Sequence, residues 1–474
     1  MNARIPVPPA LRLAHGLRFE ALYTTDGVRV LDERFREALR ATDPLLADRL
    51  DAARADPDAL DRKAESTLLV LLAPHVEDFV SQLFGIEAEA RALQARHHAL
   101  APLFAVKRQF VQRKAMNAYR ADVAAALDGG ALRAQLDAWL GAHADVASFE
   151  RAFADAVVAW QKDEAANAGR LDVAQRYAAW AAHTAAGKAA HRSGVLFRAP
   201  RKLDPLHLVP VQVVHTNGVP ALELAHDHEL RRREGFALTD AGTSFVGGLD
   251  QAHYCIWCHE QGKDSCSHGL LEKKPADGAP IANPYKKSVF GVTLAGCPLE
   301  EKISEFQKLR AEGWAVGALA MVCVDNPMAA ATGHRICNDC MKSCIYQKQD
   351  PVDIPQAETR LLKDVLALPW GFEIYSLLTR WNPLDLRRPV PLPPSGKRVL
   401  VVGQGPAGFT LAHHLLNDGH VVVAIDGLKI EPLAPNLSGV TARGERTPFE
   451  PVRDVATLTE ELDERLMAGF GGVA

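Results

Sequence analysis

Cysteine is missing from most of this sequence: only eight of its 474 residues are cysteines, and all eight lie between Cys255 and Cys344. Long apolar runs are missing too, since none approaches the roughly 20 residues with which a helix crosses a bilayer. The N-terminus has no apolar core of signal-peptide length. The net charge is only −4, with mixed signs, which excludes the basic footprint of nucleic-acid-binding proteins. We therefore expect a soluble, cytoplasmic chain with no membrane span and no nucleic-acid partner.

Residues 1–195 predict an all-α domain of unknown role. Ala, Leu, Arg, Glu and Gln dominate this region, and its apolar residues recur at the three- and four-residue spacing of a helix. The clearest stripe consists of Leu68, Leu72, Val76, Phe79, Val80 and Leu83. The region contains no chemical motif, and its scattered histidines are interpreted as ordinary helix residues. A scaffold or docking role follows from this reading.

Residues 196–250 predict a small β segment that links the helical region to the cysteines. Pro210-Val-Gln-Val-Val precedes Asn217-Gly218, and Ala221-Leu-Glu-Leu follows it. Asn-Gly suits a two-residue turn because both residues tolerate a positive φ. The pattern therefore predicts a short hairpin.

A proline-rich linker at residues 389–396 leads into an α/β pattern at residues 397–474. The expected elements are a strand at 398–402, a helix from 406 to about 417, a strand at 421–426 and a last helix after the capping box at 457–460. One β-α-β unit cannot cover both faces of a parallel sheet. We therefore expect an incomplete Rossmann-like domain, from a truncated reading frame or from a subunit that another chain completes.

The cysteines of residues 251–388 are grouped as ligands of an inorganic cofactor would be. Their positions are Cys255, Cys258, Cys266, Cys297, Cys323, Cys337, Cys340 and Cys344. Iron–sulfur clusters need soft thiolates, and CxxC spacing lets one loop supply two of them. In two-cluster ferredoxins the Cys before Pro binds the other cluster, a role that suits Cys297-Pro298. The pattern predicts an α-helical iron–sulfur domain.

Pro298 also predicts the first turn of a helix that runs to about Glu312 and ends at Gly313. The apolar residues of this helix would form a buried stripe that shields a cluster from water. They are Leu299, Ile303, Phe306 and Leu309.

Zinc is the competing interpretation of the cysteines. Four thiolates from the two CxxC pairs would suit a structural zinc ion, and four histidines lie nearby. These residues are Cys255, Cys258, Cys337 and Cys340, with His253, His259, His268 and His334. However, the pairs are much farther apart than in a zinc ribbon, and zinc gives Cys266, Cys297 and Cys344 no role. A redox disulfide is disfavoured because such pairs normally follow a flavin loop.

The glycine loop after the linker has the spacing of a dinucleotide-binding loop. It follows an apolar strand, opens a helix and is followed by an acidic residue at the end of the next strand. The residues expected to bind the cofactor are Gly403, Gly405, Pro406, Ala407, Gly408 and Asp426. Gly403 permits the tight turn, Gly405 lets backbone reach the pyrophosphate, and Gly408 allows close helix–strand packing. Asp426 would bind ribose hydroxyls. The alternative is a glycine turn that binds nothing.

From about residue 232 to 433 the chain resembles the N-terminal part of the glutamate synthase small subunit. That protein is a pyridine nucleotide-disulfide oxidoreductase with an N-terminal [4Fe–4S] domain, and dihydropyrimidine dehydrogenase carries the same module. The resemblance rests on a CxxC, a third Cys, a Cys-Pro, a second group of three cysteines and a GxGPAG loop. It implies two [4Fe–4S] clusters, FAD, and NAD(P)H in the complete assembly.

In that family the two clusters are ligated crosswise. Carried over, the resemblance gives one cluster Cys255, Cys258, Cys266 and Cys344. It gives the other cluster Cys297, Cys337, Cys340 and a fourth ligand, for which Glu358 stands in the matching place. The alternative for Glu358 is an exposed helix residue.

The sequence departs from the family pattern at two places. Thirty residues separate Cys266 from Cys297, where the family has a short link, so residues 267–296 are an insertion. Cys323 has no counterpart in the family and is expected to be a buried free thiol.

Together these features predict an FAD- and [4Fe–4S]-dependent oxidoreductase, or its N-terminal portion, with electrons moving between NAD(P)H, flavin and clusters. No catalytic acid, base or nucleophile is identified. The expected partners are a nicotinamide cofactor, an electron-acceptor domain or subunit, and a second chain that completes the nucleotide-binding domains. Two other classes stay open: an electron-relay or docking subunit without productive flavin, and a zinc-stabilised interaction scaffold.

Overall fold

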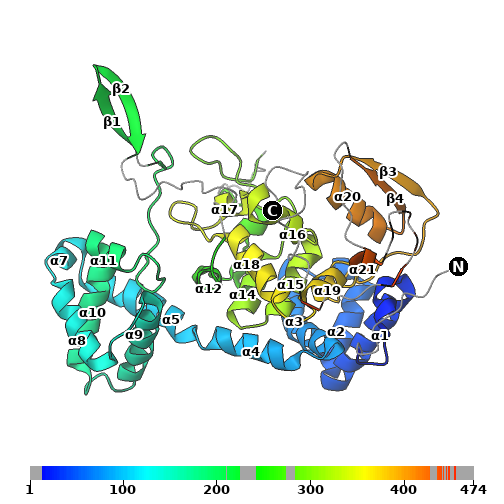
Figure 1. The fold of residues 1–474 in the computed structure, drawn as a ribbon, viewed down its shortest axis with the longest axis horizontal. Coiled ribbons are helices and arrows are strands. Elements are labelled where there is room, and N and C mark those ends of the chain that lie inside the picture. The colour runs from blue at the N-terminus through cyan, green and yellow to red at the C-terminus, as the bar shows by residue number, and fades with distance from the viewer. Residues whose placement is uncertain are drawn as a thin grey trace.

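The computed structural model describes residues 13–209, 211–224, 242–273, 283–426 and 435–439, and short pieces at 441, 443, 445, 447–448 and 453–454. Helices dominate this part of the chain, and its named strands form two separate pairs (Figure 1). The elements up to residue 190 are η1 (Phe19–Tyr23), α1 (Thr25–Thr42), α2 (Pro44–Ala55), η2 (Pro57–Ala59), α3 (Arg62–Phe84), α4 (Glu87–His98), α5 (Ala101–Val106), the π-helix η3 (Lys107–Ala115), α6 (Met116–Ala118), α7 (Ala121–Ala125), α8 (Gly129–Leu140), α9 (Val146–Trp160), η4 (Gln161–Asp163), α10 (Ala168–His183) and α11 (Ala185–Ala190).

The elements that follow carry the hairpin, the cysteine segment and the glycine loop. They are β1 (Val211–Thr216), β2 (Val219–Leu224), α12 (Phe245–Tyr254), η6 (Cys258–Gln261), α13 (Ser265–His268), α14 (Ile303–Ala311), α15 (Ala315–Asp325), α16 (Ala329–Ile336), α17 (Asp339–Ser343), α18 (Ile354–Leu366), α19 (Gly371–Leu378), β3 (Arg398–Val402), α20 (Pro406–Asn417), β4 (Val421–Ile425) and α21 (Pro435–Ser438).

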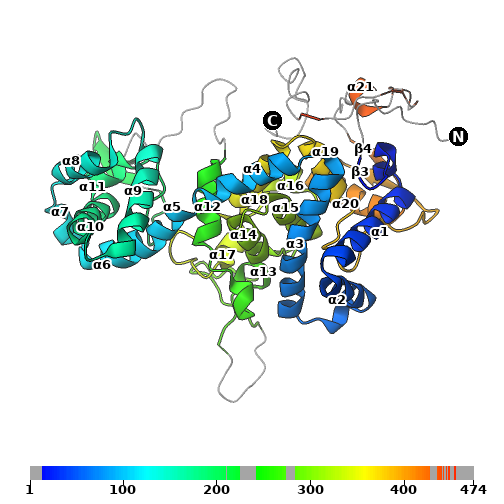
Figure 2. The same ribbon diagram turned by 90° about the horizontal axis from the view of Figure 1, so that it is seen from below.

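Two hydrophobic cores organise the helices. The first core joins α1 to α4 with α14, α15, α18 and α19, and it includes the buried cysteines. The second core is built from α5, η3 and α7 to α10 together with residues 195–197 and Leu249. Figures 1 and 2 show the second group as a lobe to one side, reached through α4 and α5. Residues 1–195, which the sequence groups as one helical domain, thus contribute to two cores.

Helix α3 ties the N-terminal helices to the cysteine segment. It is the one described helix long and apolar enough to cross a membrane, but 61% of its apolar window is buried inside the molecule. Its Glu77 accepts hydrogen bonds from the backbone N–H groups of Val316 (2.9 Å) and Gly317 (3.1 Å) at the start of α15. Burial raises the pKa of Glu77 to about 7, and the two N–H groups oppose this rise. A carboxylate at this end of α15 also interacts favourably with the helix dipole.

The hairpin predicted around Asn217-Gly218 is confirmed. Strands β1 and β2 pair antiparallel, with Thr216 opposite Val219. Asn217 and Gly218 both have positive φ (55° and 81°), as a tight turn of this type requires. The hairpin projects from the body of the molecule (Figure 1).

The helix predicted from Pro298 begins later than expected. Glu300 has a φ of 51°, which a right-handed helix cannot contain, so α14 starts only at Ile303. Leu299 is therefore not part of the buried stripe and is 53% exposed, whereas Ile303, Phe306 and Leu309 are buried as predicted. The helix predicted after residue 457 lies outside the described residues.

A substitution at the crossing of α3 and α15 tests the first core. A Cβ on Gly317 would come within 2.6 Å of the Ala73 carbonyl oxygen, so Gly317→Ala must push the two helices apart. We expect a loss of about 1–3 kcal/mol in the free energy of unfolding, measured by urea denaturation. Gly169→Ala in α10 is the control, because nothing lies within 4 Å of a Cβ there. Equal stability of Gly317→Ala and the unaltered chain would contradict this packing.

Candidate functional site

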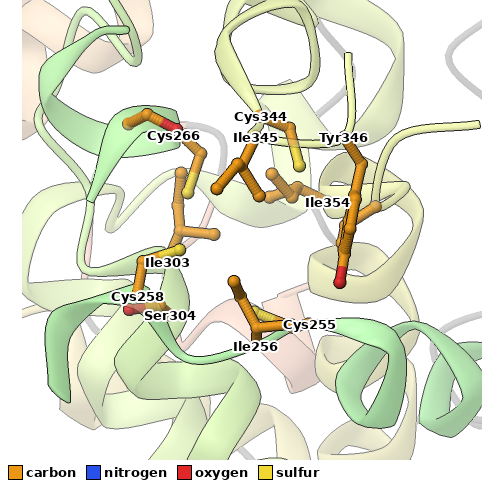
Figure 3. Close-up of a pocket in the computed structure, with 12 residues that line it drawn as sticks. Cys255, Ile256, Cys258, Cys266, Ile303, Ser304, Cys344, Ile345, Tyr346 and Ile354 are labelled. Atoms are coloured by element: carbon orange, nitrogen blue, oxygen red, sulfur yellow. The ribbon is translucent and has the colours of Figure 1, made fainter. Parts of the chain in front are cut away.

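Four cysteines from three stretches of the chain line one cavity (Figure 3). They are Cys255, Cys258, Cys266 and Cys344. The first follows the C-terminus of α12, the second opens η6, the third lies in α13 and the fourth follows α17. These are the four residues that the resemblance assigns to one cluster.

The rest of the cavity wall is mostly apolar. It consists of Ile256, Ser265, Ile303, Ser304, Ile345, Tyr346, Val352 and Ile354. The space between these residues, including the part that is open to solvent, is about 330 Å³. Walls of this kind exclude water and lower the local dielectric constant, which are the levers by which a protein tunes a buried cofactor.

Backbone N–H groups point at two of the sulfurs. Trp257 has a φ of 53°, and this left-handed residue turns the CxxC loop so that its own N–H donates to Cys255 Sγ at 3.5 Å. The N–H groups of Tyr346 and Val352 donate to the Cys344 sulfur. Such donors stabilise negative charge on sulfur.

Burial sets the protonation of the free thiols. It raises the pKa of Cys258 to about 11 and raises the pKa values of Cys255, Cys266 and Cys344 as well. Nearby Asp264 adds to the effect at Cys266, whose Sγ donates to Asp264 Oδ1 at 2.9 Å. Without metal these thiols are neutral at pH 7, so a bound metal has to displace their protons.

The two ends of the insertion between Cys266 and Cys297 lie next to each other at the site. The Cys297 N–H donates to the Cys266 carbonyl at 2.8 Å, which places the two residues side by side. The preceding Gly296 has a φ of 89°, and a Cβ there would come within 2.6 Å of the Ser267 carbonyl oxygen. Its N–H donates to Ser343 Oγ at 3.0 Å. The insertion therefore leaves Cys266 of the first predicted ligand group beside Cys297 of the second.

The second predicted group gathers on the far side of that link. The pKa of the Cys340 thiol is raised by burial first, and then by the nearby charges of Glu301, Cys297, Cys337 and Glu358. Cys337 is exposed, whereas Cys340 is buried. The interpretation of Glu358 as an exposed helix residue is wrong, because it is only 6% exposed. It accepts a hydrogen bond from Asn326 Nδ2 at 2.8 Å, and burial raises its pKa to about 7.

Glu301 is a buried carboxyl group beside this second group that sequence reasoning did not single out. It is 4% exposed, its Oε1 has no hydrogen-bond partner, and burial together with Glu358 raises its pKa well above the usual range. A helix that begins at Pro298 would place Glu301 in its first turn, whereas α14 begins only at Ile303, so the sequence pattern did not indicate this burial. Only its position four residues after Cys297 points to the site.

Cys323 lies in α15 and is buried, as predicted for a residue without a family counterpart. Burial raises the pKa of its thiol, and nearby Glu358 and Glu301 raise it further.

The ligands proposed for zinc do not come together. Cys337 and Cys340 do not line the cavity that holds Cys255 and Cys258. Three of the neighbouring histidines have other contacts: His253 stacks on Phe104, His259 Nδ1 lies 2.6 Å from Ser304 Oγ, and His268 Nδ1 lies 3.3 Å from Glu300 Oε2. Across the described part of the chain, no three His, Cys, Asp or Glu side chains converge on a single ion site.

The glycine loop has the local geometry predicted for it. Strands β3 and β4 pair in parallel, with α20 connecting them. Gly403 has a φ of 94°, and a Cβ on Gly408 would lie 1.7 Å from the Gly403 carbonyl oxygen, so only glycine fits there. Asp426 follows β4 directly, and its Oδ2 accepts from the Gln404 N–H at 2.5 Å. Pro406 and Ala407 form the first turn of α20.

Comparisons with known proteins divide the chain. Residues 13–85 match the family described as the RP005 N-terminal alpha-helical domain. The uncharacterized protein RP005 of Rickettsia prowazekii is 28% identical over 309 residues, which is 64% of this chain and 99% of RP005. The uncharacterized protein RP006 of the same organism is 54% identical over 147 residues, which is 31% of this chain. That alignment spans only 19% of RP006.

A distant similarity points to redox chemistry. The small chain of NADPH glutamate synthase from Mycobacterium tuberculosis is 30% identical over 132 residues, which is 28% of this chain and 24% of that protein. No solved structure matches the chain. The similarity to this relative is partial, and it supports a general oxidoreductase role.

The raised thiol pKa values predict how the cysteines react once metal is removed. With a pKa of about 11, Cys258 holds far less reactive thiolate at pH 8 than a free thiol does. In the metal-free folded chain we expect Cys258 to react with iodoacetamide roughly a hundredfold more slowly than in urea, since each pKa unit is a factor of ten. Exposed Cys337 is the internal control and should react at similar rates in both conditions. Peptide mass spectrometry measures both rates, and equal protection of the two cysteines would contradict the described burial.

Proposed function

We propose that this chain is an FAD- and [4Fe–4S]-dependent oxidoreductase, or the N-terminal portion of one. One observation carries the proposal: four cysteines that lie as far apart in sequence as Cys255 and Cys344 line a single, mostly apolar cavity. The partial similarity to NADPH glutamate synthase small chain supports the same chemistry.

One cluster would be held by Cys255, Cys258, Cys266 and Cys344. The other would take Cys297, Cys337 and Cys340, with a buried carboxylate as the fourth ligand. Glu358 fits this place because it is buried and its carboxyl group lies near Cys340. A hard oxygen ligand is unusual on a soft cluster and would shift its reduction potential.

A bound cluster would supply one-electron transfer. The chain would supply the apolar wall and the backbone N–H donors around the cluster. Ile303 and Ile354 keep water from the sulfurs. The N–H groups of Trp257, Tyr346 and Val352 stabilise negative charge on the thiolates. Both effects help to set the reduction potential.

FAD is the proposed partner of the glycine loop. The N-terminus of α20 would face the pyrophosphate, because its free N–H groups and dipole favour negative charge. Gly405 precedes that helix with an extended backbone, and Asp426 would take the ribose hydroxyls. The carboxylate already accepts from Gln404, so nucleotide binding would add to this contact or replace it.

The described part of the proposed nucleotide-binding unit leaves apolar side chains uncovered. The parallel pair β3–β4 exposes large apolar side chains, among them Leu400 (59%), Val402 (74%) and Val423 (53%). Parallel sheets are normally covered on both faces. We propose that a further domain or a second chain covers this pair, completes a Rossmann-like fold and binds NAD(P)H. An acceptor domain or subunit would exchange electrons with the clusters.

Iron content tests the assignment of the first cluster. Cys344→Ser removes a thiolate from the cavity, so we expect loss of about half of the iron and acid-labile sulfide after anaerobic purification. Cys323→Ser is the matched control: Cys323 is buried like Cys344 but lies outside the cavity, so its iron content should match the unaltered chain. Colourless preparations of the unaltered chain, without iron or sulfide, would overturn the proposal.

Flavin binding tests the glycine loop. Gly408→Ala forces a Cβ into the Gly403 carbonyl, so the loop cannot keep its shape and FAD affinity should fall at least about tenfold. Gly396→Ala in the preceding linker is the control, since no atom lies within 4 Å of its Cβ, although its φ of 74° adds some strain. Fluorescence titration with FAD measures both. If the clusters are present but neither the unaltered chain nor the Gly396→Ala variant binds flavin, the chain is an electron-relay subunit.

A further inference from the structure

A second cavity lies beside the thiol cavity, between the π-helix η3 and helix α12. The space between its lining residues, counting the part open to solvent, is about 570 Å³. Its lining residues are Phe104, Lys107, Arg108, Gln112, Arg113, Asp250, His253, Tyr254 and Tyr346. π-helical turns are rare and occur frequently at functional sites. Apart from Tyr346, which also lines the thiol cavity, none of these residues lines that cavity or belongs to the glycine loop.

The cavity carries an excess of positive charge. Lys107 Nζ donates to both carboxylate oxygens of Asp250, at 2.6 and 2.8 Å, so this buried pair is neutral overall. Arg108 and Arg113 remain, and neither forms an ion pair within the described part of the chain. Burial, with His97 and Arg108 nearby, lowers the pKa of His253 to about 4, so this ring is neutral at pH 7. The two guanidinium groups therefore present about two uncompensated charges.

Aromatic rings form much of the wall. Tyr254 stacks on Tyr346 with ring centroids 4.6 Å apart and planes 11° apart. His253 stacks on Phe104 with centroids 4.5 Å apart. The Tyr254 hydroxyl donates to the Asp350 carbonyl at 2.9 Å and accepts from Gln349 Nε2 at 2.6 Å, which holds its ring in place. Flat, fixed rings beside guanidinium groups suit a planar anion.

Tyr346 connects the two cavities. Its ring lines both of them, and it follows Cys344 by two residues. An occupant of the second cavity would therefore be separated from a group held by the thiols by one aromatic side chain.

We propose that the second cavity binds a planar, anionic, redox-active small molecule of the quinone or flavin type, which exchanges electrons with the iron–sulfur group in the thiol cavity. The electron exchange rests on the proposed function; the binding does not. A reduced [4Fe–4S] group would give up one electron, so a quinone would take its two electrons from two such groups in turn, or from one group that NAD(P)H or dithionite reduces again in between. With two protons from solvent, the two electrons convert the quinone to the hydroquinone.

Binding is tested with anthraquinone disulfonate and flavin mononucleotide, two planar anions, on the full chain purified without oxygen. We expect equilibrium dialysis to show saturable binding of at least one, weakened by added salt. The double variant Arg108→Gln/Arg113→Gln should lower the affinity for the anion about tenfold or more, because each substitution removes a charge-assisted contact. Arg49→Gln, at an exposed arginine of α2, is the control and should bind as the unaltered chain does. Methyl viologen, a planar dication, should show no binding that depends on the two arginines.

Binding that is equal in the double variant and the control would overturn the inference, as would failure of both anions to bind. Electron transfer is followed by bleaching and recovery of the iron–sulfur absorbance when the anion is added to the dithionite-reduced chain. Recovery should slow in the double variant. A chain that binds the anion through the arginines but holds no iron would refute the proposed function and leave the binding site standing. A chain that holds iron but binds neither anion would refute the binding site and leave the proposed function standing.

Discussion

The backbone hydrogen bond from Cys297 to Cys266 is the contact on which the cysteine-rich region depends. It closes the insertion and brings the Cys-Pro of one ligand group beside the third thiol of the other. The same closure brings Gly296 against Ser343, next to the last thiol of the first cavity. Long insertions cost little when their ends are held together, because loop-closure entropy grows slowly with length. Two ligand groups can therefore interleave although thirty residues separate their middle members.

The helices that surround the thiols give this arrangement its support. Glu77 reaches from α3 to the first N–H groups of α15, and Ser66 of α3 donates to Glu305 of α14. Helix α14 in turn carries Ile303, which lines the thiol cavity, and α15 carries Cys323, which lies near Glu301 and Glu358. The segment that matches the RP005 helical domain is thus part of the core that contains the buried cysteines. This gives the N-terminal helices a structural task, since they close the hydrophobic shell on which cofactor potentials depend.

Local features such as turns and the β3–α20–β4 unit were predictable from sequence, whereas the burial of Glu301 and Glu358 and the exposure of Leu299 were not. The turn at Asn217-Gly218 and the β3–α20–β4 unit follow from short-range chemistry, in which positive φ and helix-opening residues act within a few positions. The exposure of Leu299 depends on an unusual backbone turn, and the burial of Glu358 depends on how distant helices pack. Leu299 is exposed because the backbone at Glu300 turns left-handed before α14 begins. Glu358 is buried because α18 packs its carboxyl group against Asn326, and no local pattern marks that contact. Glu301 was missed for the same reason.

The two candidate cofactor regions differ in how complete they are. The thiol cavity is lined by residues of this chain, and three of its four cysteines (Cys255, Cys266 and Cys344) belong to the main core. The strands β3 and β4 have only α20 packed on them among the described elements, and most of their side chains are exposed. A two-stranded sheet with open apolar faces is marginally stable on its own, because burial against neighbouring elements supplies most of its free energy. The shape of the glycine loop therefore depends on contacts beyond those of the described elements. The thiol cavity, in contrast, is built from residues that pack within the described helices.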